Sequence, residues 1–242
     1  MLLEDLCGGN AEVLEYVLKW SALAVQKPWK KCVTALVFQG PQGCGKGTFA
    51  NQLVGSFFGK GLHYSHIVNA EHLCGTFNGI VATSILVVLD ECIYPGNHSH
   101  ASVLKSLLQD EQKILRNLYK DAVMIPSYDH VIINSNESFC VKAEKGCRSY
   151  ATVLVSSRHQ GDSAYWTSLY KHIGNGGREA LLYHLLHEID IESFVPEEIS
   201  QALDGSRWSM KIHSLSDVDT FILKILRDPH DYMFDGELAC VQ

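Results

Sequence analysis

The sequence predicts an α/β fold in which helices cover both faces of a parallel sheet. Four short apolar runs indicate buried strands, at residues 33–38, 84–89, 131–133 and 152–155. The run at 84–89 is apolar on both faces, which is typical of a strand covered on two sides. Segments with helical spacing lie between the runs, and strands that alternate with helices predict a three-layer α/β sandwich.

Helical signals surround the first strand. Apolar residues recur at helical spacing over residues 10–26, where Asn10 is the predicted N-cap and Pro28 follows the last turn. A second helix is expected from residue 49 to about residue 58. Residues 71–79 predict a short helix and a turn before the second strand.

A helix and a hairpin are expected between the second and third strands. Helical spacing at residues 103–108 marks the helix, which follows a loop at Pro95-Gly96. Residues 113–128 alternate loosely between apolar and polar side chains. They predict a hairpin with Lys120-Asp121 near its turn.

Strand signals end at about residue 162. Three amphipathic helices are predicted beyond it, at residues 177–189, 196–203 and 217–226. We therefore expect two units. Residues 1–160 form the core, with its short N-terminal helix, and residues 161–242 form a small helical region.

Composition limits the classes of protein to consider. Hydrophobic residues make up 46% of the chain and the formal net charge is −7, so a broad basic face for nucleic acid is not expected. A nucleic-acid partner would meet local loops. No apolar run reaches the roughly 18 residues that span a membrane, and Glu4 and Asp5 stand where a signal peptide has its basic region. We expect an intracellular protein with no membrane partner.

The cysteines and histidines predict neither disulfides nor a metal centre. Eight cysteines are scattered along the chain without a Cys-x-x-Cys pair. This favours free thiols in a reducing compartment, the cytoplasm or nucleus of the host cell. The histidine pairs His63/His66 and His98/His100 have no neighbouring cysteine or acidic cluster, so loop histidines are the preferred interpretation.

A glycine-rich turn joins the first strand to the helix that follows. It comprises Gly40, Pro41, Gln42, Gly43, Cys44, Gly45, Lys46, Gly47 and Thr48. Glycines let backbone N–H groups point at an anion, and the helix N-terminus adds partial positive charge. Lys46 can reach the β- and γ-phosphates of a nucleotide. The pattern predicts a P-loop that binds ATP with Mg²⁺.

The last position of this turn departs from the usual pattern. Gly47 stands where Ser or Thr normally contacts Mg²⁺, and Thr48 follows one residue later. We expect Thr48 to serve the metal. Because it is displaced, Mg²⁺ is expected to be held through water, with Asp90 carrying more of the coordination.

Two carboxylates close the second strand. Asp90 and Glu91 follow Lys46 by about 44 residues, as in a Walker B motif. The aspartate is predicted to hold Mg²⁺ and the glutamate to polarise the attacking water. A motor that hydrolyses nucleotides needs the second carboxylate, whereas a phosphate-transferring kinase does not. The alternative is a surface Asp-Glu pair at a strand end.

Two residues that come later in the sequence are candidates for contacting the γ-phosphate. Asn136 ends the third strand and is predicted to hydrogen-bond the γ-phosphate or the water. Asn134, or a simple turn asparagine, is the alternative. Arg148 is predicted to act as an arginine finger on the γ-phosphate of a neighbouring subunit, which stabilises transition-state charge. The alternative is a surface arginine.

Basic residues in the predicted hairpin are candidate contacts to single-stranded DNA. Lys120 and Arg116 are predicted to touch backbone phosphates. Lys113 is a further basic neighbour, and Tyr119 could stack on a base. A solvated turn lysine is the alternative for Lys120.

The order of these motifs resembles that of superfamily 3 helicases. It is more closely similar to the helicase-like domain of primase-helicases from bacteriophages, other viruses and mobile elements. The similarity extends over most of residues 6–205. Besides the motifs above, it includes Leu6-Cys7-Gly8-Gly9-Asn10, His72-Leu73-Cys74-Gly75-Thr76-Phe77-Asn78, Leu104-Lys105-Ser106-Leu107 and Gly176-Gly177-Arg178-Glu179-Ala180-Leu181-Leu182.

This resemblance implies an AAA+ core and a homo-oligomer, a hexameric ring with ATP between subunits. It also implies single-stranded DNA in the central channel and a primase domain or protein as a partner. It implies the same roles for the motif residues Lys46, Thr48, Asp90, Glu91, Asn136, Arg148 and Lys120. One departure concerns the finger, because the family often has paired arginines and Ser149 follows Arg148 here.

The function predicted is an ATP-dependent DNA helicase that acts in replication of a virus or mobile element. Two alternatives stay open. Gly-Lys-Gly-Thr also occurs in adenylate kinases, although a kinase needs several arginines to clamp two nucleotides and this chain has six in all. The other alternative is a P-loop ATPase that loads or assembles on DNA without unwinding it.

Overall fold

The computed structural model describes residues 2–59, 62–74, 79–92, 98–116, 121–136 and 148–200, and also residues 202–203, 222, 233–234 and 237–238. At its centre is a parallel sheet of five strands in the order β2-β3-β6-β1-β7. The strands are β1 (Ala35–Gln39), β2 (Tyr64–Ile67), β3 (Leu86–Asp90), β6 (His130–Ser135) and β7 (Tyr150–Leu154). The chain therefore has a mixed α/β fold, as its sequence predicts.

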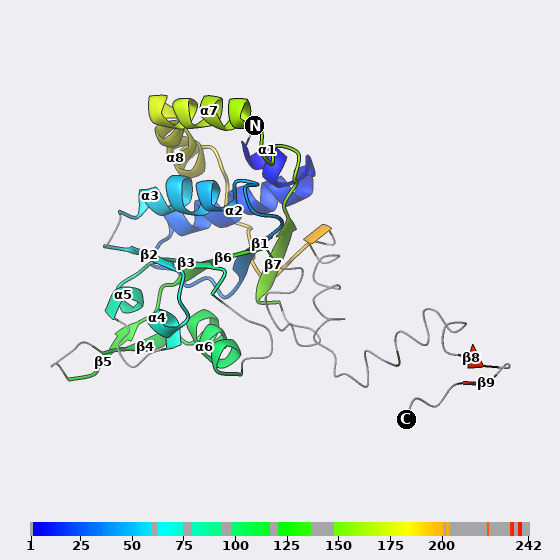
Figure 1. The fold of residues 1–242 in the computed structure, drawn as a ribbon. Helices are drawn as coiled ribbons and strands as arrows, with labels where there is room; N and C mark the ends of the chain where they lie inside the picture. The colour runs from blue at the N-terminus through cyan, green and yellow to red at the C-terminus, as the bar shows by residue number, and fades with distance from the viewer. Residues whose placement is uncertain are drawn as a thin grey trace.

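Helices cover both faces of this sheet (Figure 1). One face carries α1 (Leu2–Leu6), α2 (Ala11–Gln26), the π-helical turn η1 (Thr48–Val54) and α3 (Gly55–Phe57), with α7 (Ser163–His172), η2 (Ile173–Gly177) and α8 (Arg178–His187) further out. The other face carries α4 (Glu71–Cys74), α5 (Gly79–Ala82), α6 (His98–Gln109) and a hairpin of β4 (Gln112–Leu115) and β5 (Val123–Pro126).

Alternation along the strands divides the core into two clusters. On β1, Leu36 and Phe38 pack with the α1–α2–η1 side, whereas Ala35 and Val37 pack with the α4–α6 side. Successive side chains of a strand point to opposite faces, so a strand covered on both sides must be apolar throughout. All five residues of β1 are buried.

All four strands expected from the sequence are present, but β2 was not anticipated. It lies at the edge of the sheet and pairs only with β3. Two of its four residues, Ser65 and His66, are polar, and His66 is exposed. An edge strand needs fewer apolar positions than a central one, so the apolar runs gave no signal for it. The hairpin prediction is confirmed by the antiparallel pair β4–β5.

The helix predictions hold unevenly. Asn10 caps α2 as expected, since its side chain accepts hydrogen bonds from the backbone N–H groups of Glu12 and Val13. The helix over residues 177–189 is confirmed by α8. In contrast, α7 was missed, because Leu169 is its one buried residue and the apolar period is weak.

Two expectations for the C-terminal region are wrong. Residues 196–200 form turns and irregular chain, and among the described residues of the expected helix only 202–203 are helical. There the Tyr16 hydroxyl donates to the Pro196 carbonyl at 2.6 Å, a tertiary contact that local helix signals do not include. Strands also recur beyond residue 162, where Met233–Phe234 (β8) pairs with Glu237–Leu238 (β9). The helix expected at 217–226 lies outside the described residues, except for residue 222.

The described helices of the C-terminal region share the core of the sheet. Leu169, Ile173 and Leu185 belong to the same buried cluster as Val17 and Trp20 of α2. The Gln26 amide also donates to the carbonyls of Leu185 at 2.6 Å and Ile189 at 2.9 Å. The division at residues 160 and 161 stays a prediction.

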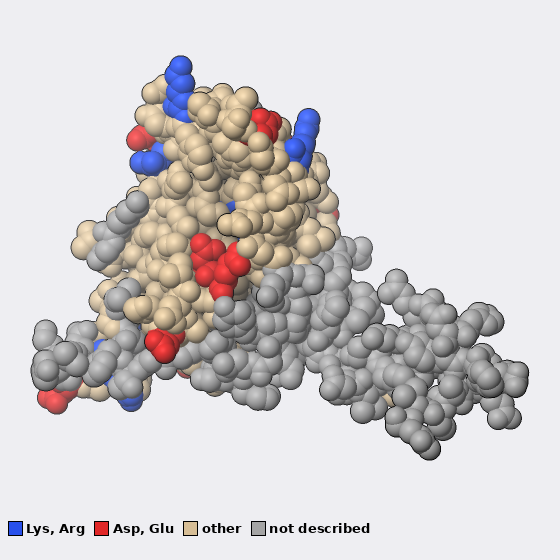
Figure 2. All heavy atoms as spheres, in the orientation of Figure 1, with Lys and Arg blue, Asp and Glu red and all other residues tan. Residues whose placement is uncertain are grey.

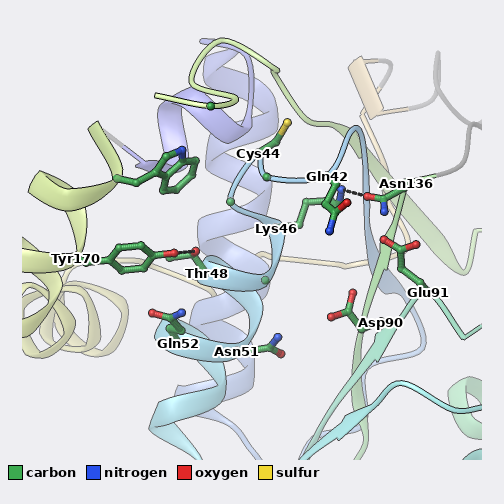
Figure 3. Close-up of a pocket in the computed structure, with 15 residues that line it drawn as sticks. Gln42, Cys44, Lys46, Thr48, Asn51, Gln52, Asp90, Glu91, Asn136 and Tyr170 are labelled. Carbon is green, nitrogen blue, oxygen red and sulfur yellow. Dashed lines mark hydrogen bonds between the residues drawn. The ribbon is translucent and has the colours of Figure 1, made fainter. Parts of the chain in front are cut away.

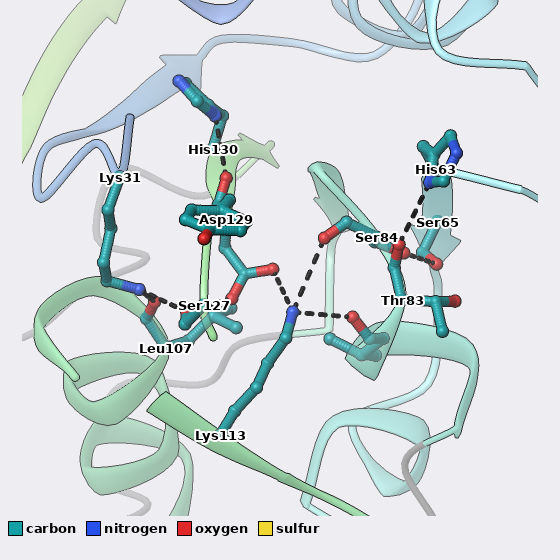
Figure 4. A network of polar contacts seen from close by, with 12 residues as sticks. Lys31, His63, Ser65, Thr83, Ser84, Leu107, Lys113, Ser127, Asp129 and His130 are labelled. Carbon is teal, nitrogen blue, oxygen red and sulfur yellow. Dashed lines mark hydrogen bonds and ion pairs between the residues drawn. The ribbon is translucent and has the colours of Figure 1, made fainter. Parts of the chain in front are cut away.

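A buried polar network fixes the hairpin to the sheet (Figure 4). Lys113 of β4 forms an ion pair of 2.6 Å with Asp129, whose side chain has 0% exposure. Ser127 donates to the other carboxylate oxygen at 2.7 Å, and the Lys31 amine donates to Ser127 at 2.6 Å. Because charges buried this deeply require a partner, the network fixes the hairpin where it leaves the sheet.

His130, the first residue of β6, predicts a pH dependence of stability. Its Nδ1 lies 3.1 Å from the Tyr128 carbonyl oxygen, so Nδ1–H donates, and Nε2 is buried without a partner among the described residues. Burial lowers the pKa of His130 to about 4, against an ordinary value of 6.5. Between these two pH values the unfolded chain binds a proton that the folded chain excludes.

We expect this histidine to lower the free energy of unfolding, by up to about 1.4 kcal/mol per pH unit, as pH falls from 6.5 towards about 4. His130→Asn keeps a hydrogen-bond donor towards the Tyr128 carbonyl. It should reduce the dependence of the free energy of unfolding on pH. Urea unfolding at pH 7.5 and pH 5 measures the change in the free energy of unfolding, with His187→Asn, at an exposed histidine of α8, as control. If the free energy of unfolding falls equally between these two pH values in the wild type and in His130→Asn, His130 is not the source of the pH dependence.

Candidate functional site

A cavity of about 590 Å³ opens where strands β1, β3 and β6 end (Figure 3). In open parallel sheets, ligands bind beyond the carboxyl ends of the strands. Its lining comprises Gln42, Gly43, Cys44, Gly45, Lys46, Gly47, Thr48, Asn51, Gln52, Asp90, Glu91, Asn136, Gly161, Trp166 and Tyr170. The structure thus brings the predicted P-loop, both carboxylates and Asn136 to one place.

The loop between β1 and η1 has the backbone that a phosphate cradle requires. Gly43 and Gly45 have positive φ angles of 82° and 94°. Such angles favour glycine and turn successive N–H groups in one direction. The N–H of Gly40 donates to the Ser135 carbonyl at 3.1 Å, which ties the start of the loop to β6.

Lys46 is buried at the centre of the cavity, with 6% exposure. Its amine donates to the carbonyl oxygens of Gly40 and Pro41 and to Oδ1 of Asn136, the last at 2.7 Å. Burial lowers the pKa of Lys46, while Cys44, Glu91 and Asp90 oppose that shift. The amine is therefore held between the loop and the end of β6.

The carboxylates of Asp90 and Glu91 are positioned by different interactions. Oδ2 of Asp90 lies 3.0 Å from Nε2 of His66 on β2. Glu91 has a φ angle of 53°, the one positive value for a non-glycine residue in the described part of the chain. Its N–H donates to the Asn134 carbonyl at 3.1 Å. Strained backbone of this kind clusters at functional sites.

Thr48 has a contact that the sequence did not indicate. Its hydroxyl lies 3.0 Å from the Tyr170 hydroxyl of α7. Figure 3 shows Thr48 pointing toward Tyr170 and away from Asp90 and Glu91. The role of Thr48 at the metal therefore stays a prediction. No group of three or more His, Cys, Asp or Glu side chains suited to a metal ion occurs in the described residues.

The two asparagines have different surroundings. Asn136 faces Lys46, as a sensor of bound phosphate would. Asn134 is 1% exposed, and neither atom of its amide has a hydrogen-bond partner in the described part of the chain. Of the two, Asn136 alone lines the cavity.

The structure adds Trp166 and Tyr170 of α7 to the site. Nε1 of Trp166 donates to the His159 carbonyl at 2.8 Å, and its ring lies against Gly45. The sequence offered one signal for them, two aromatic residues at spacing i, i+4. Aromatic residues at this spacing more often belong to a hydrophobic core than to a binding site. Because α7 itself was not anticipated, neither residue was named.

Arg148 lies apart from the cavity within this chain. It is exposed and precedes β7, where its carbonyl accepts a hydrogen bond of 3.0 Å from the Thr34 hydroxyl. Thr34 precedes β1, whereas the glycine-rich loop follows β1. Arg148 therefore lies at the opposite end of the strands from that loop. A role on the nucleotide of a neighbouring subunit stays a prediction.

The predicted DNA contacts are only partly visible. Arg116 is exposed directly after β4, whereas Lys120 lies outside the described residues. Lys113 is bound to Asp129 inside the fold, so it anchors the hairpin. Figure 2 shows acidic side chains near the middle of the drawn face and basic ones toward its upper end and lower left. This face has no broad basic surface among its described residues.

The structure describes the side chains of four cysteines. Cys7, Cys32 and Cys44 are free and buried, and Cys92 is buried as well. Burial raises the pKa of the Cys7 and Cys32 thiols to about 12, which makes them poor nucleophiles. Among the helices that the structure describes, none has both the length and the apolarity that a bilayer crossing requires.

Gly45→Ala should distort the glycine-rich loop that lines the cavity. A Cβ at this position would lie 2.7 Å from Cη2 of Trp166, and the φ angle of 94° is unfavourable for alanine. Strain and clash together should weaken nucleotide binding and lower stability by about 1–3 kcal/mol. Gly174→Ala is the control, because a Cβ there meets nothing within 4 Å. Calorimetric melting and ATP titration would measure both effects; equal behaviour of the two variants would contradict this view.

The chain is similar to one protein family and to one phage protein. Residues 38–148 match the model of a family of unknown function (DUF5906). Over 170 residues the chain is 27% identical to the DNA primase-polymerase of Nitratiruptor phage NrS-1, which covers 69% of this chain and 23% of that protein. The chain is thus homologous to part of a phage primase-polymerase and spans under a quarter of its length.

The chain shares its fold with the C-terminal region of the NrS-1 protein. The apo structure of the NrS-1 C-terminal region superposes with a TM-score of 0.76 at 23% identity, covering 94% of this chain and 53% of that one. A JCV helicase structure superposes with a TM-score of 0.45 at 16% identity, over 93% of this chain and 70% of the other.

Proposed function

We propose that this chain is an AAA+ P-loop ATPase of superfamily 3 type, a DNA helicase that acts in replication of a virus or mobile element. The observation that carries the proposal is the meeting of Lys46, Asp90, Glu91 and Asn136 at one cavity, at the ends of three neighbouring strands. Homology to a phage primase-polymerase supports a place in DNA replication.

The proposal gives each of these residues a task, and the Thr48 hydroxyl, which contacts Tyr170 in this structure, would have to turn toward Asp90 to perform its own. The loop N–H groups and the Lys46 amine bind the β- and γ-phosphates. Glu91 orients the attacking water and accepts its proton, while Asn136 reports whether phosphate is bound. Asp90, with Thr48 directly or through water, would hold Mg²⁺, which neutralises charge between the phosphates. Mg²⁺ needs few protein ligands, because substrate phosphates and water complete its shell.

The proposal extends to assembly and to DNA. Arg148, away from the cavity in its own chain, would reach the site of the next subunit in a hexameric ring. The hairpin β4–β5 would present Arg116 and Lys120 to single-stranded DNA in the channel. A primase, as a domain or as a separate protein, would be the functional partner.

The test is the rate of ATP hydrolysis with and without single-stranded DNA, run beside a measurement of AMP-dependent ADP formation. Stimulation by DNA is the expected result. AMP-dependent ADP formation would point instead to a nucleotide kinase. A third outcome is that DNA changes the rate of hydrolysis but the protein does not separate the strands of a forked DNA. This outcome would point to a DNA-loading ATPase.

A further inference from the structure

Two aromatic side chains of α7, Trp166 and Tyr170, line the cavity. Figure 3 shows Tyr170 on the side of Thr48 that faces away from Asp90 and Glu91. We infer that these rings bind the base of the nucleotide, so that the site recognises a nucleoside triphosphate by its base as well as by its phosphates. The inference rests on the proposed nucleotide binding and extends it, because phosphate-loop residues do not distinguish a nucleotide from a bare triphosphate.

The Trp166 ring is fixed directly beside the phosphate loop. Its Nε1 donates to the His159 carbonyl at 2.8 Å. Its other edge approaches Gly45 so closely that a Cβ there would lie 2.7 Å from Cη2. Gly45 immediately precedes Lys46, so the ring is close to the phosphate-binding lysine. A base attached through a ribose to phosphates on this loop would be within its reach.

The Tyr170 ring is fixed in the same manner. Its hydroxyl lies 3.0 Å from the Thr48 hydroxyl, and its ring centre is 6.3 Å from that of Trp166, with 35° between the planes. Each ring is thus held by a polar group at its edge. An aromatic ring held in this way loses little conformational entropy when a base stacks on its face.

The exposure of Tyr170 separates a binding role from a packing role. Tyr170 is 44% exposed, whereas its neighbour Leu169 is 5% exposed and joins the core. Leu169 therefore attaches α7 to the fold without help from Tyr170. The cavity of about 590 Å³ lies within the roughly 300–1,000 Å³ typical of small-molecule sites.

Binding of MgATP and of magnesium tripolyphosphate to the purified chain tests the inference. Tyr170→Ala should weaken ATP binding about tenfold, since base–aromatic stacking is of that order, and leave tripolyphosphate binding unchanged. Tyr170→Phe keeps the ring but loses the hydroxyl contact to Thr48 that holds it, so it should bind ATP more tightly than Tyr170→Ala does. Tyr183→Ala, an exposed tyrosine of α8 outside the cavity, is the control and should change neither affinity.

A second measurement uses Trp166. Trp166→Phe should reduce the change in tryptophan fluorescence that ATP causes, while tripolyphosphate should cause little change in either protein. Equal weakening of ATP and tripolyphosphate by Tyr170→Ala would overturn the inference, because α7 would then only shape the phosphate loop. Unchanged ATP affinity would overturn it too, with nucleotide binding intact. A wild type that binds neither ligand would remove the proposed function and this inference together.

Discussion

Replacement of Lys46 by methionine should lower the rate of ATP hydrolysis by about 100-fold or more. Lys46 is the one lysine or arginine among the described residues that line the cavity. Loss of a single preorganised donor to transition-state charge typically costs that much. Methionine keeps the apolar stem of the side chain, so the fold should survive while the charge is lost.

Phosphate release and thermal melting, measured on the same preparations, would check this prediction. Lys19→Met is the matched control, because Lys19 lies on the surface of α2 and pairs with Glu15 at 2.6 Å. Exposed pairs contribute about 0–1 kcal/mol, so this variant should hydrolyse ATP normally. Turnover that survives in Lys46→Met would show that the catalytic centre lies elsewhere.

The candidate site was predictable because its residues follow buried parallel strands. Parallel pairing places Asp90 opposite Asn134, and Gln39 opposite Ser135. Whatever follows β1, β3 and β6 therefore meets at one edge of the sheet. The strand order itself, with β6 between β3 and β1, does not follow from apolar runs.

The rest of the site depends on contacts between segments far apart in the chain. Tyr170 meets Thr48 across 122 residues, and no local pattern encodes that pairing. Lys113 has the same limitation. In the sequence it is one more basic residue near a hairpin, whereas in the fold it is committed to buried Asp129. Charge alone does not tell a solvent-facing lysine from one that is paired inside.

Glu91→Gln should bind ATP and hydrolyse it about 10²- to 10⁴-fold more slowly, as expected for the loss of a general base. Glutamine has nearly the same shape and keeps the backbone N–H that donates to the Asn134 carbonyl at 3.1 Å. The substitution removes the negative charge and, with it, the ability to accept a proton. Fluorescent-nucleotide binding and single-turnover hydrolysis would separate the two steps. Glu111→Gln, an exposed residue outside the cavity, serves as the control.

The backbone of Glu91 allows a sharper comparison with Glu91→Gly. A φ angle of 53° costs a residue with a side chain roughly 1 kcal/mol or more, and glycine adopts it readily. Glycine should therefore maintain or raise the melting temperature while hydrolysis falls as far as in Glu91→Gln. A merely structural glutamate would behave differently, because both variants would then keep hydrolysing ATP. Loss of ATP binding in Glu91→Gln would likewise contradict the role of general base. Strain that lowers stability at this position is best explained by the carboxylate that it directs into the cavity.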